Sequence, residues 1–225
     1  MLVKFASLAV LLALAGCGSV ATKPDTEEPA DQQATAAEET SVNESSYADI
    51  DSDTLSIYKH GLKLLKSGNY KQALIHWTRM SENNPDFPGV WVNLSLAQSH
   101  NDDYESAKAS IETALELKPG FCPALIAMGP VERQLGEFLA AEDYYKQAIT
   151  CSSGNSADLH YNLGILYDLY LNEPAKALMQ YKAAQRQYKN KDEQLEIWIT
   201  DLTRRQEAQL SSQPQPETVA DGEGN

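Results

Sequence analysis

The sequence repeats itself with a period of 34 residues, and this period constrains the fold more than any other feature. The clearest copy is Pro88 to Phe121, and copies with the same spacing begin at Thr54 and Cys122. A fourth copy begins near Ala157 and needs one inserted residue in its turn before its second half comes into register. Such a period is typical of proteins in which each copy is one structural unit that stacks on its neighbours.

Three positions in each copy share a residue type. The eighth position is small (Gly61, Ser95, Gly129, Gly164), as is the twentieth (Ala73, Ala107, Ala141, Ala177), whereas the twenty-fourth is large (Trp77, Ile111, Tyr145, Tyr181). Each copy also has two stretches with apolar residues at helical spacing, separated by a turn. Pro85 and Pro119 are expected to end the second helix of their copies. Two helices cannot bury both faces alone, so we expect stacking of successive pairs to supply the core.

This pattern resembles the tetratricopeptide repeat from Thr54 to about Tyr188. The resemblance implies an all-α superhelix, an α-solenoid of four helical hairpins over residues 54–87, 88–121, 122–156 and 157–190. Apolar residues at helical spacing in residues 191–210 predict a capping helix for the last hairpin: Leu195, Trp198, Ile199 and Leu202. Residues 211–225 are rich in proline, glycine and acids, which predicts a disordered tail.

Residues 1–16 have the pattern of a lipoprotein signal peptide. Lys4 precedes an apolar run that is shorter than the roughly 20 residues needed to span a bilayer. Leu14-Ala15-Gly16-Cys17 resembles the lipobox of bacterial lipoproteins, which implies that Cys17 carries the lipid, palmitate included, and begins the mature chain. In the sorting rule of enterobacterial lipoproteins, an aspartate directly after the lipidated cysteine is a signal for the inner membrane. The residue at this position is Gly18, which favours the outer membrane. The alternative is an ordinary signal peptide with a chance cysteine at its cleavage site.

The segment that follows, residues 17–53, is predicted to be a flexible acidic linker. It holds ten carboxylates against the single Lys23 and has few large apolar residues. The alternative is a specific acidic ligand for a basic partner. The whole chain has a net charge of −14, which argues against nucleic acid as a partner because phosphate binding needs a basic surface. Membrane attachment is therefore expected through the lipid alone.

No pattern in the sequence predicts an enzyme, a metal site or a cofactor. The four histidines lack metal-ligand spacing, and the glycines at repeat spacing are expected at helix contacts, not in a phosphate loop. His60 falls on a core position of the first copy and is predicted to be packed.

The resemblance also implies a binding surface. In tetratricopeptide repeats the first helix of each unit lines a concave groove, which here would present Tyr58, Leu62, Lys66, Val92, Asn93, Leu96, His100, Ile126, Arg133, Tyr161, Asn162, Ile165 and Asp168. An amide such as that of Asn93 could hydrogen-bond the backbone of an extended peptide. The alternative for Leu62, Leu96 and Ile165 is packing against neighbouring units.

Two functions are compatible with these features. The first is a periplasmic scaffold on the outer membrane, resembling repeat lipoproteins that bring cell-wall enzymes such as peptidoglycan hydrolases together with proteases. The second is a pilotin, resembling the repeat lipoprotein that escorts secretin subunits of type IV pili. Both bind periplasmic or outer-membrane proteins.

Cys122 and Cys151 are predicted to form a disulfide. They stand at positions 1 and 30 of one copy, and antiparallel helices bring those ends together in an oxidising compartment. The alternative is a pair of free thiols. In the same copy, Pro130 falls inside the first helix and predicts either a kink or a tolerated irregularity.

Overall fold

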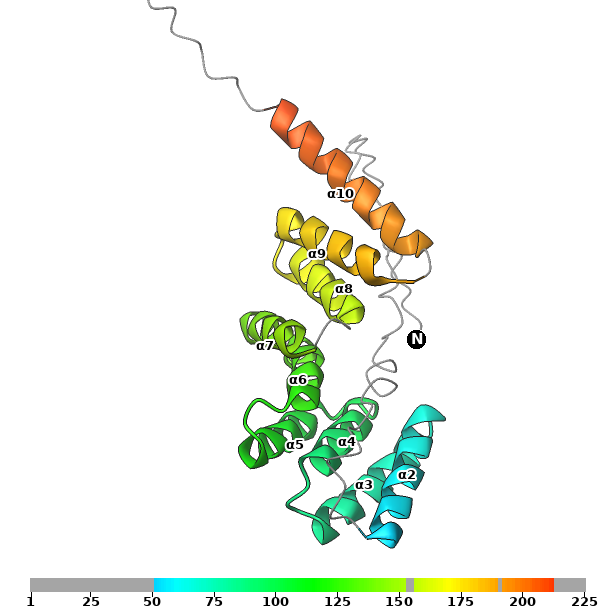
Figure 1. Ribbon diagram of the computed structural model, residues 1–225. Coiled ribbons are helices and arrows are strands. Elements are labelled where there is room, and N and C mark those ends of the chain that lie inside the picture. The colour runs from blue at the N-terminus through cyan, green and yellow to red at the C-terminus, as the bar shows by residue number, and fades with distance from the viewer. Residues whose placement is uncertain (1–50, 153–155, 190–191, 213–225) are drawn as a thin grey trace, which may run out of the picture. The chain divides into compact units, whose positions relative to one another are not determined.

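The computed structural model describes residues 51–152, 156–189 and 192–212. The predicted signal peptide, Cys17, the linker up to residue 50 and the tail from residue 213 lie outside these ranges. Within them the secondary structure is helical with no strand, which confirms the all-α class. Figure 1 shows the helices in chain order.

The helices form pairs that follow the sequence period. Their bounds are α2 Ser52–Lys66, α3 Tyr70–Asn83, α4 Pro88–Ser99, α5 Tyr104–Leu117, α6 Cys122–Gln134, α7 Phe138–Cys151, α8 Ala157–Ile165, the π-helical segment η3 Leu166–Tyr170, α9 Pro174–Gln187 and α10 Glu193–Ser211. Each first helix packs against its second helix, and α4, α6 and α8 also pack against the preceding pair. The result is the tetratricopeptide-repeat solenoid that the period predicts. Helix α6 continues through Pro130, so this proline does not end it.

One backbone conformation recurs in the turn of each of the four hairpins, at position 15 in the first three. Gly68, Asp102 and Gly136 have φ angles of 72°, 62° and 82°, and Asn172 has 52°. A left-handed residue reverses the chain after a helix, and glycine, asparagine and aspartate adopt this conformation at the lowest cost. Asn172 is displaced by one residue relative to the other three, so the inserted residue of the fourth copy lies before it.

The inserted residue lengthens the first helix and does not enlarge the turn, which corrects the expectation from the sequence. The backbone N–H of Leu171 donates to the carbonyl of Leu166, five residues earlier, at 3.0 Å. This bond is that of a π-helix, which absorbs one extra residue without ending the helix. The fourth hairpin therefore keeps its pairing with α9.

A single steric relationship explains the small residues at position 8. A Cβ added to Gly61, Gly129 or Gly164 would lie 2.5, 2.8 or 2.5 Å from the ring of Trp77, Tyr145 or Tyr181 respectively. These rings stand at position 24 and are almost fully buried. In the second hairpin position 24 is Ile111, and there position 8 is Ser95. Glycine thus occurs where the partner is an aromatic ring that lies against the backbone.

The first hairpin has a polar outer face. Positions 3, 7 and 10 are buried and apolar in the later hairpins (Val90, Leu94, Ala97; Ala124, Met128, Val131; Leu159, Leu163, Leu166). In α2 the same positions are the exposed residues Ser56, His60 and Lys63. The prediction that His60 is packed is therefore wrong, because within the described residues no hairpin precedes α2 to cover it.

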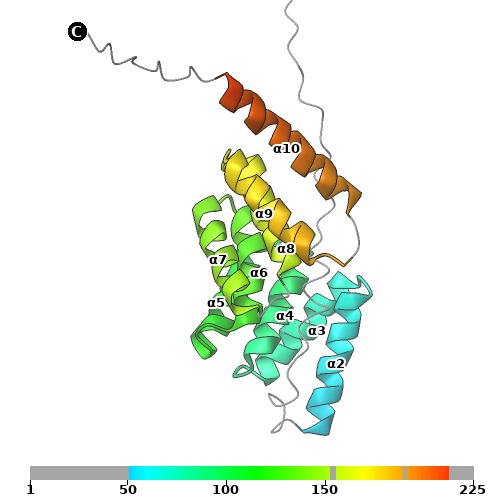
Figure 2. The same cartoon turned by 45° about the horizontal axis from the view of Figure 1, so that its top comes forward.

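The last hairpin is covered by α10, as the sequence predicts. Leu195 and Leu202 are fully buried, and Trp198 stacks on Tyr161 with 5.8 Å between ring centroids and 18° between planes. Figures 1 and 2 both show α10 alongside α9. Asp192 caps α10 by accepting a hydrogen bond from the backbone N–H of Leu195.

Candidate partner-binding surface

The thirteen predicted groove residues divide by exposure. Six are buried (Tyr58, Val92, Asn93, Arg133, Tyr161, Ile165), six are half-buried (Leu62, Leu96, His100, Ile126, Asn162, Asp168), and Lys66 is exposed. Burial leaves little of the first six side chains for a ligand to contact. The accessible part of the predicted surface is therefore carried by the other seven.

Tyr58 and Asn93 join the first two hairpins. The Asn93 amide donates to the Tyr58 hydroxyl at 2.7 Å, and both residues are less than 10% exposed. The Tyr58 ring also meets the ring of Trp77 edge-on, with centroids 5.0 Å apart. The amide predicted to hold a peptide backbone is thus occupied by a neighbouring hairpin.

Tyr161 and Ile165 lie in the core of the fourth hairpin. The rings of Tyr161, Trp198 and Tyr181 contact one another, with centroids 5.8, 6.2 and 5.5 Å apart. Burial raises the pKa of the Tyr161 hydroxyl, as does the nearby charge of Asp192. The predicted capping helix therefore covers a residue that the repeat pattern assigned to the groove.

Arg133 is held by aromatic residues. Its Nη1 donates to the Tyr170 hydroxyl at 3.1 Å, and its guanidinium lies 5.6 Å from the Tyr170 ring. Burial lowers the pKa of Arg133, but interactions with Tyr145 and Tyr170 outweigh this and raise it, so the group stays charged. Tyr170 was not among the predicted residues. It belongs to η3, where the inserted residue shifts the repeat positions.

His100 is stacked on Tyr70, another residue that the repeat pattern did not select. Their ring centroids are 3.8 Å apart and the planes differ by 6°. Burial lowers the pKa of His100, and the charge of Asp102 partly opposes this shift. Because Tyr70 begins α3 and His100 follows α4, the stack joins the ends of two hairpins at the edge of the predicted groove.

The accessible predicted residues come from all four first helices. Leu62, Leu96 and Ile126 supply partly exposed apolar surface from α2, α4 and α6. Asn162 and Asp168 supply polar groups from α8 and η3. A surface of apolar groups with flanking polar groups fits a peptide or protein segment better than a small ion.

The described ranges provide neither a metal centre nor a membrane span. No three or more histidine, cysteine or acidic side chains within them are grouped so that they could hold a metal ion. None of the helices there is long and apolar enough to cross a membrane.

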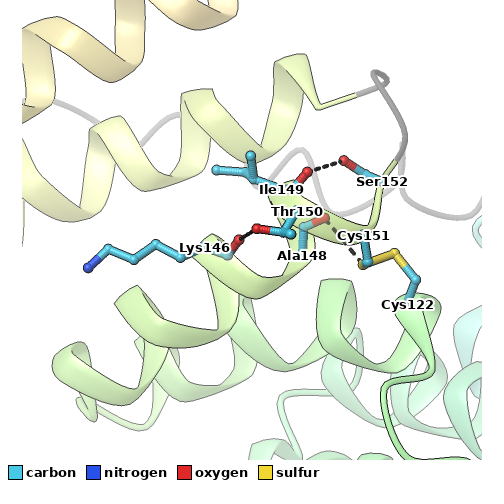
Figure 3. The surroundings of a disulfide bond; sticks show 7 residues. All are labelled: Cys122, Lys146, Ala148, Ile149, Thr150, Cys151 and Ser152. Atoms are coloured by element: carbon cyan, nitrogen blue, oxygen red, sulfur yellow. Dashed lines mark hydrogen bonds between the residues drawn. A yellow bond between two sulfur atoms is a disulfide. The ribbon is translucent and has the colours of Figure 1, made fainter.

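Cys122 and Cys151 are joined in the structure. Cys122 begins α6 and Cys151 ends α7, with their Cα atoms 5.7 Å apart and the sulfur atoms bonded (Figure 3). This Cα separation is in the usual range for a disulfide. The bond connects the open ends of the third hairpin, on the side opposite its turn.

Comparison with known proteins supports the same fold. Residues 88–121 match the tetratricopeptide repeat family. A sequence comparison with curated proteins gives no match. The structure is similar to that of pilF from Pseudomonas aeruginosa, with a TM-score of 0.62, 18% identity, and coverage of 70% of each chain.

Two further solved structures have the same arrangement. MamA from Desulfovibrio magneticus RS-1 gives a TM-score of 0.60 at 15% identity. The match covers 72% of this chain and 90% of the MamA chain. TTC0263, a thermophilic tetratricopeptide-repeat protein from Thermus thermophilus, gives a TM-score of 0.56 at 24% identity. The match covers 71% of this chain and 86% of TTC0263. One unit is matched by sequence, and the described residues form four hairpins, so the chain has the fold of tetratricopeptide-repeat proteins.

Proposed function

We propose that this protein is an adaptor of the periplasm, anchored to the outer membrane through a lipid on Cys17, that binds partner proteins with its first helices. The observation that carries the proposal is the solenoid itself, because repeat folds of this kind present an extended surface and bind proteins. The anchor rests on the sequence Leu14-Ala15-Gly16-Cys17 and on the acidic linker that follows it.

The accessible groove residues suggest how a partner is held. Leu62, Leu96 and Ile126 lie on successive first helices, so an extended segment could contact each in turn. Arg133 is buried against Tyr170 and Asn93 against Tyr58, so these two residues shape the surface from beneath.

Metabolic labelling tests the anchor. The wild-type chain should incorporate a palmitate analogue and fractionate with outer membranes, whereas Cys17→Ser should lose both properties because the thiol is the acyl acceptor. Equal labelling of the two proteins would refute the lipid anchor while leaving the binding surface untouched.

Paired variants test the binding surface. Proteins captured by the wild-type chain from solubilised membranes should be lost with Leu62→Arg or Ile126→Arg, since arginine at a partly exposed apolar contact disrupts it. The control is Ile75→Arg, because Ile75 is 73% exposed on the second helix α3. Capture that survives the first two variants, or that fails equally with the third, would count against the groove.

The second candidate is a pilotin role in secretin assembly. The similarity to the pilF structure favours keeping it, although at 18% identity that similarity shows the fold alone. Deletion of the gene distinguishes the two roles. Loss of secretin multimers is expected for a pilotin, whereas intact multimers with altered levels of cell-wall enzymes are expected for a scaffold.

A further inference from the structure

A basic stripe runs along α2, at the start of the solenoid. Lys59, Lys63 and Lys66 are exposed and spaced four and three residues apart, which places them on one face of the helix. Among the described residues, no carboxylate forms an ion pair with Lys59 or Lys63. Lys63 and Lys66 stand in the last turn, where the helix dipole favours cations, but Lys59 is too far from that end to gain from it.

The stripe makes the first hairpin unlike the others. Residues 54–87 contain five basic residues (lysine or arginine) and two acidic ones. Residues 88–121 contain two basic residues and five acidic ones. Lys63 is also part of the polar outer face of α2, next to His60 and Ser56. A hairpin from a second copy would need apolar residues at these positions to stack there. A polar, acidic and extended segment suits this face better.

Such a segment directly precedes α2 in the chain. Residues 38–49 include Glu38, Glu39, Glu44 and Asp49 and no basic residue. Lys66 lies about 22 Å along the helix from the N-cap Asp51, at 1.5 Å per residue. Seven extended residues from Asp51 back to Glu44 span about 23 Å, so the segment is long enough to turn back and run beside the whole stripe.

We infer that residues 38–49 dock on the Lys59–Lys63–Lys66 stripe of the same chain. The short connection gives the segment a local concentration on the order of millimolar at this face, which favours it over free acidic ligands. The attraction is electrostatic and therefore weakens with salt. If the groove binds partners as proposed above, the docked segment competes at its α2 end with any acidic partner. The docking itself does not depend on that function.

Carbodiimide crosslinking of the purified full chain tests the inference, because the reagent joins a carboxylate and a lysine amine only when they touch. We expect amide crosslinks from Glu38, Glu39 or Glu44 to Lys59, Lys63 or Lys66, mapped by mass spectrometry. Raising NaCl from about 20 mM to 0.5 M should reduce them about five-fold or more, because screening shortens the range of the attraction. Tethering alone would not depend on salt in this way.

Two matched variants identify the site through the remaining Lys66. Lys59→Gln with Lys63→Gln should lower the crosslinks to Lys66 several-fold, because two of the three charges are gone. Lys59→Arg with Lys63→Arg keeps the charges but offers no amine, so the Lys66 crosslinks should persist. Lys182→Gln, an exposed lysine on α9, should leave them unchanged.

Three results would overturn the inference. The first is crosslinks from residues 38–49 to Lys146 and Lys182 at the same yield as to the stripe. The second is a yield that salt does not change. The third is heavy–light crosslinks in a mixture of isotope-labelled and unlabelled chains, which would show that the segment docks on a second copy.

Discussion

Lys108 on α5 and Glu132 on α6 form a 3.0 Å ion pair across the boundary between the second and third hairpins. Glu142 on α7 and Tyr167 on η3 occupy the same two repeat positions one unit later, and the Tyr167 hydroxyl donates to the Glu142 carboxylate at 2.6 Å. The third hairpin supplies the carboxylate at both boundaries, from its first helix α6 toward the second hairpin and from its second helix α7 toward the fourth. Both boundaries therefore have a polar contact at these two repeat positions.

The Lys108–Glu132 pair is predicted to contribute to stability. Glu132 is only 3% exposed, so Lys108→Met would leave a buried carboxylate without its partner. The hydrogen bond from Lys108 to Glu132, which raises the pKa of the lysine, would also be lost. We expect the free energy of unfolding in urea to fall by about 1–3 kcal/mol.

The control for this prediction is Lys182→Met, which removes an exposed lysine from α9 and should change stability by less than about 0.5 kcal/mol. The double variant Lys108→Met with Glu132→Met should recover part of the loss, because no buried charge remains. Equal effects of the two lysine variants would show that the pair contributes nothing.

Gly164→Ala is predicted to destabilise the fourth hairpin. Its Cβ would lie 2.5 Å from the Tyr181 ring, closer than nonbonded carbon atoms approach, so the ring or the helices must move. Overpacking of this kind costs about 1–3 kcal/mol, measured as the change in unfolding free energy.

The second hairpin supplies the compensating change, because there a side chain at position 8 coexists with Ile111. Gly164→Ala should cost less in a Tyr181→Ile background than in the wild type. A double-mutant cycle with no coupling would contradict the steric explanation.

Tyr58→Phe is predicted to lower the free energy of unfolding. The variant keeps the ring beside Trp77 but removes the hydroxyl that accepts the Asn93 amide hydrogen bond. A buried amide left without this acceptor should cost about 1–2 kcal/mol in thermal or urea unfolding. An unchanged unfolding free energy together with weaker partner binding would instead show that Tyr58 contacts the partner in the groove.

Acidification is predicted to destabilise the fold through His100. Burial lowers its pKa in the folded state below the ordinary 6.5, so the unfolded state binds the proton more readily. Stability is therefore unaffected well above pH 6.5 and falls as pH drops from 6.5 toward the folded pKa. His76, whose pKa is lowered mainly by burial and also by His60, adds to the same trend.

His100→Phe should reduce this pH dependence while retaining a ring against Tyr70. The measurement is the unfolding free energy at pH 7.5 and pH 5.5. An identical pH dependence in the variant and the wild type would assign the effect to other groups.

The four hairpins could be predicted from the sequence because small and large residues recur at the positions where the helices contact one another. Gly61, Gly129 and Gly164 recur since each adjoins a large ring, and this requirement is local to one unit. The packing of α10 on the last hairpin could also be predicted, because Leu195 and Leu202 stand at helical spacing and both are buried.

The groove could be predicted only in part, because exposure depends on neighbours that a position number does not encode. Tyr161 has a groove position but lies under Trp198, which belongs to a helix outside the repeats. His60 has a core position but is exposed because no hairpin covers α2 in the described chain. Tyr170 was missed because one inserted residue at η3 moves it off the pattern.

The disulfide is predicted to stabilise the third hairpin. Cys122 and Cys151 are 29 residues apart, and closing a loop of this size contributes roughly 3.5 kcal/mol in the chain-entropy estimate. Reduction of the wild type should lower the unfolding free energy by up to about this amount. Cys122→Ala with Cys151→Ala should match the reduced wild type and be insensitive to reductant.

Mass spectrometry under non-reducing conditions shows whether the bond forms in cells. After denaturation without reductant, neither cysteine should react with an alkylating reagent, and the tryptic peptides that contain them should be found joined. Free alkylation of both thiols would mean that the hairpin is held by packing alone. In that case the Ala148 and Leu125 contacts within the core, not the crosslink, would determine its stability.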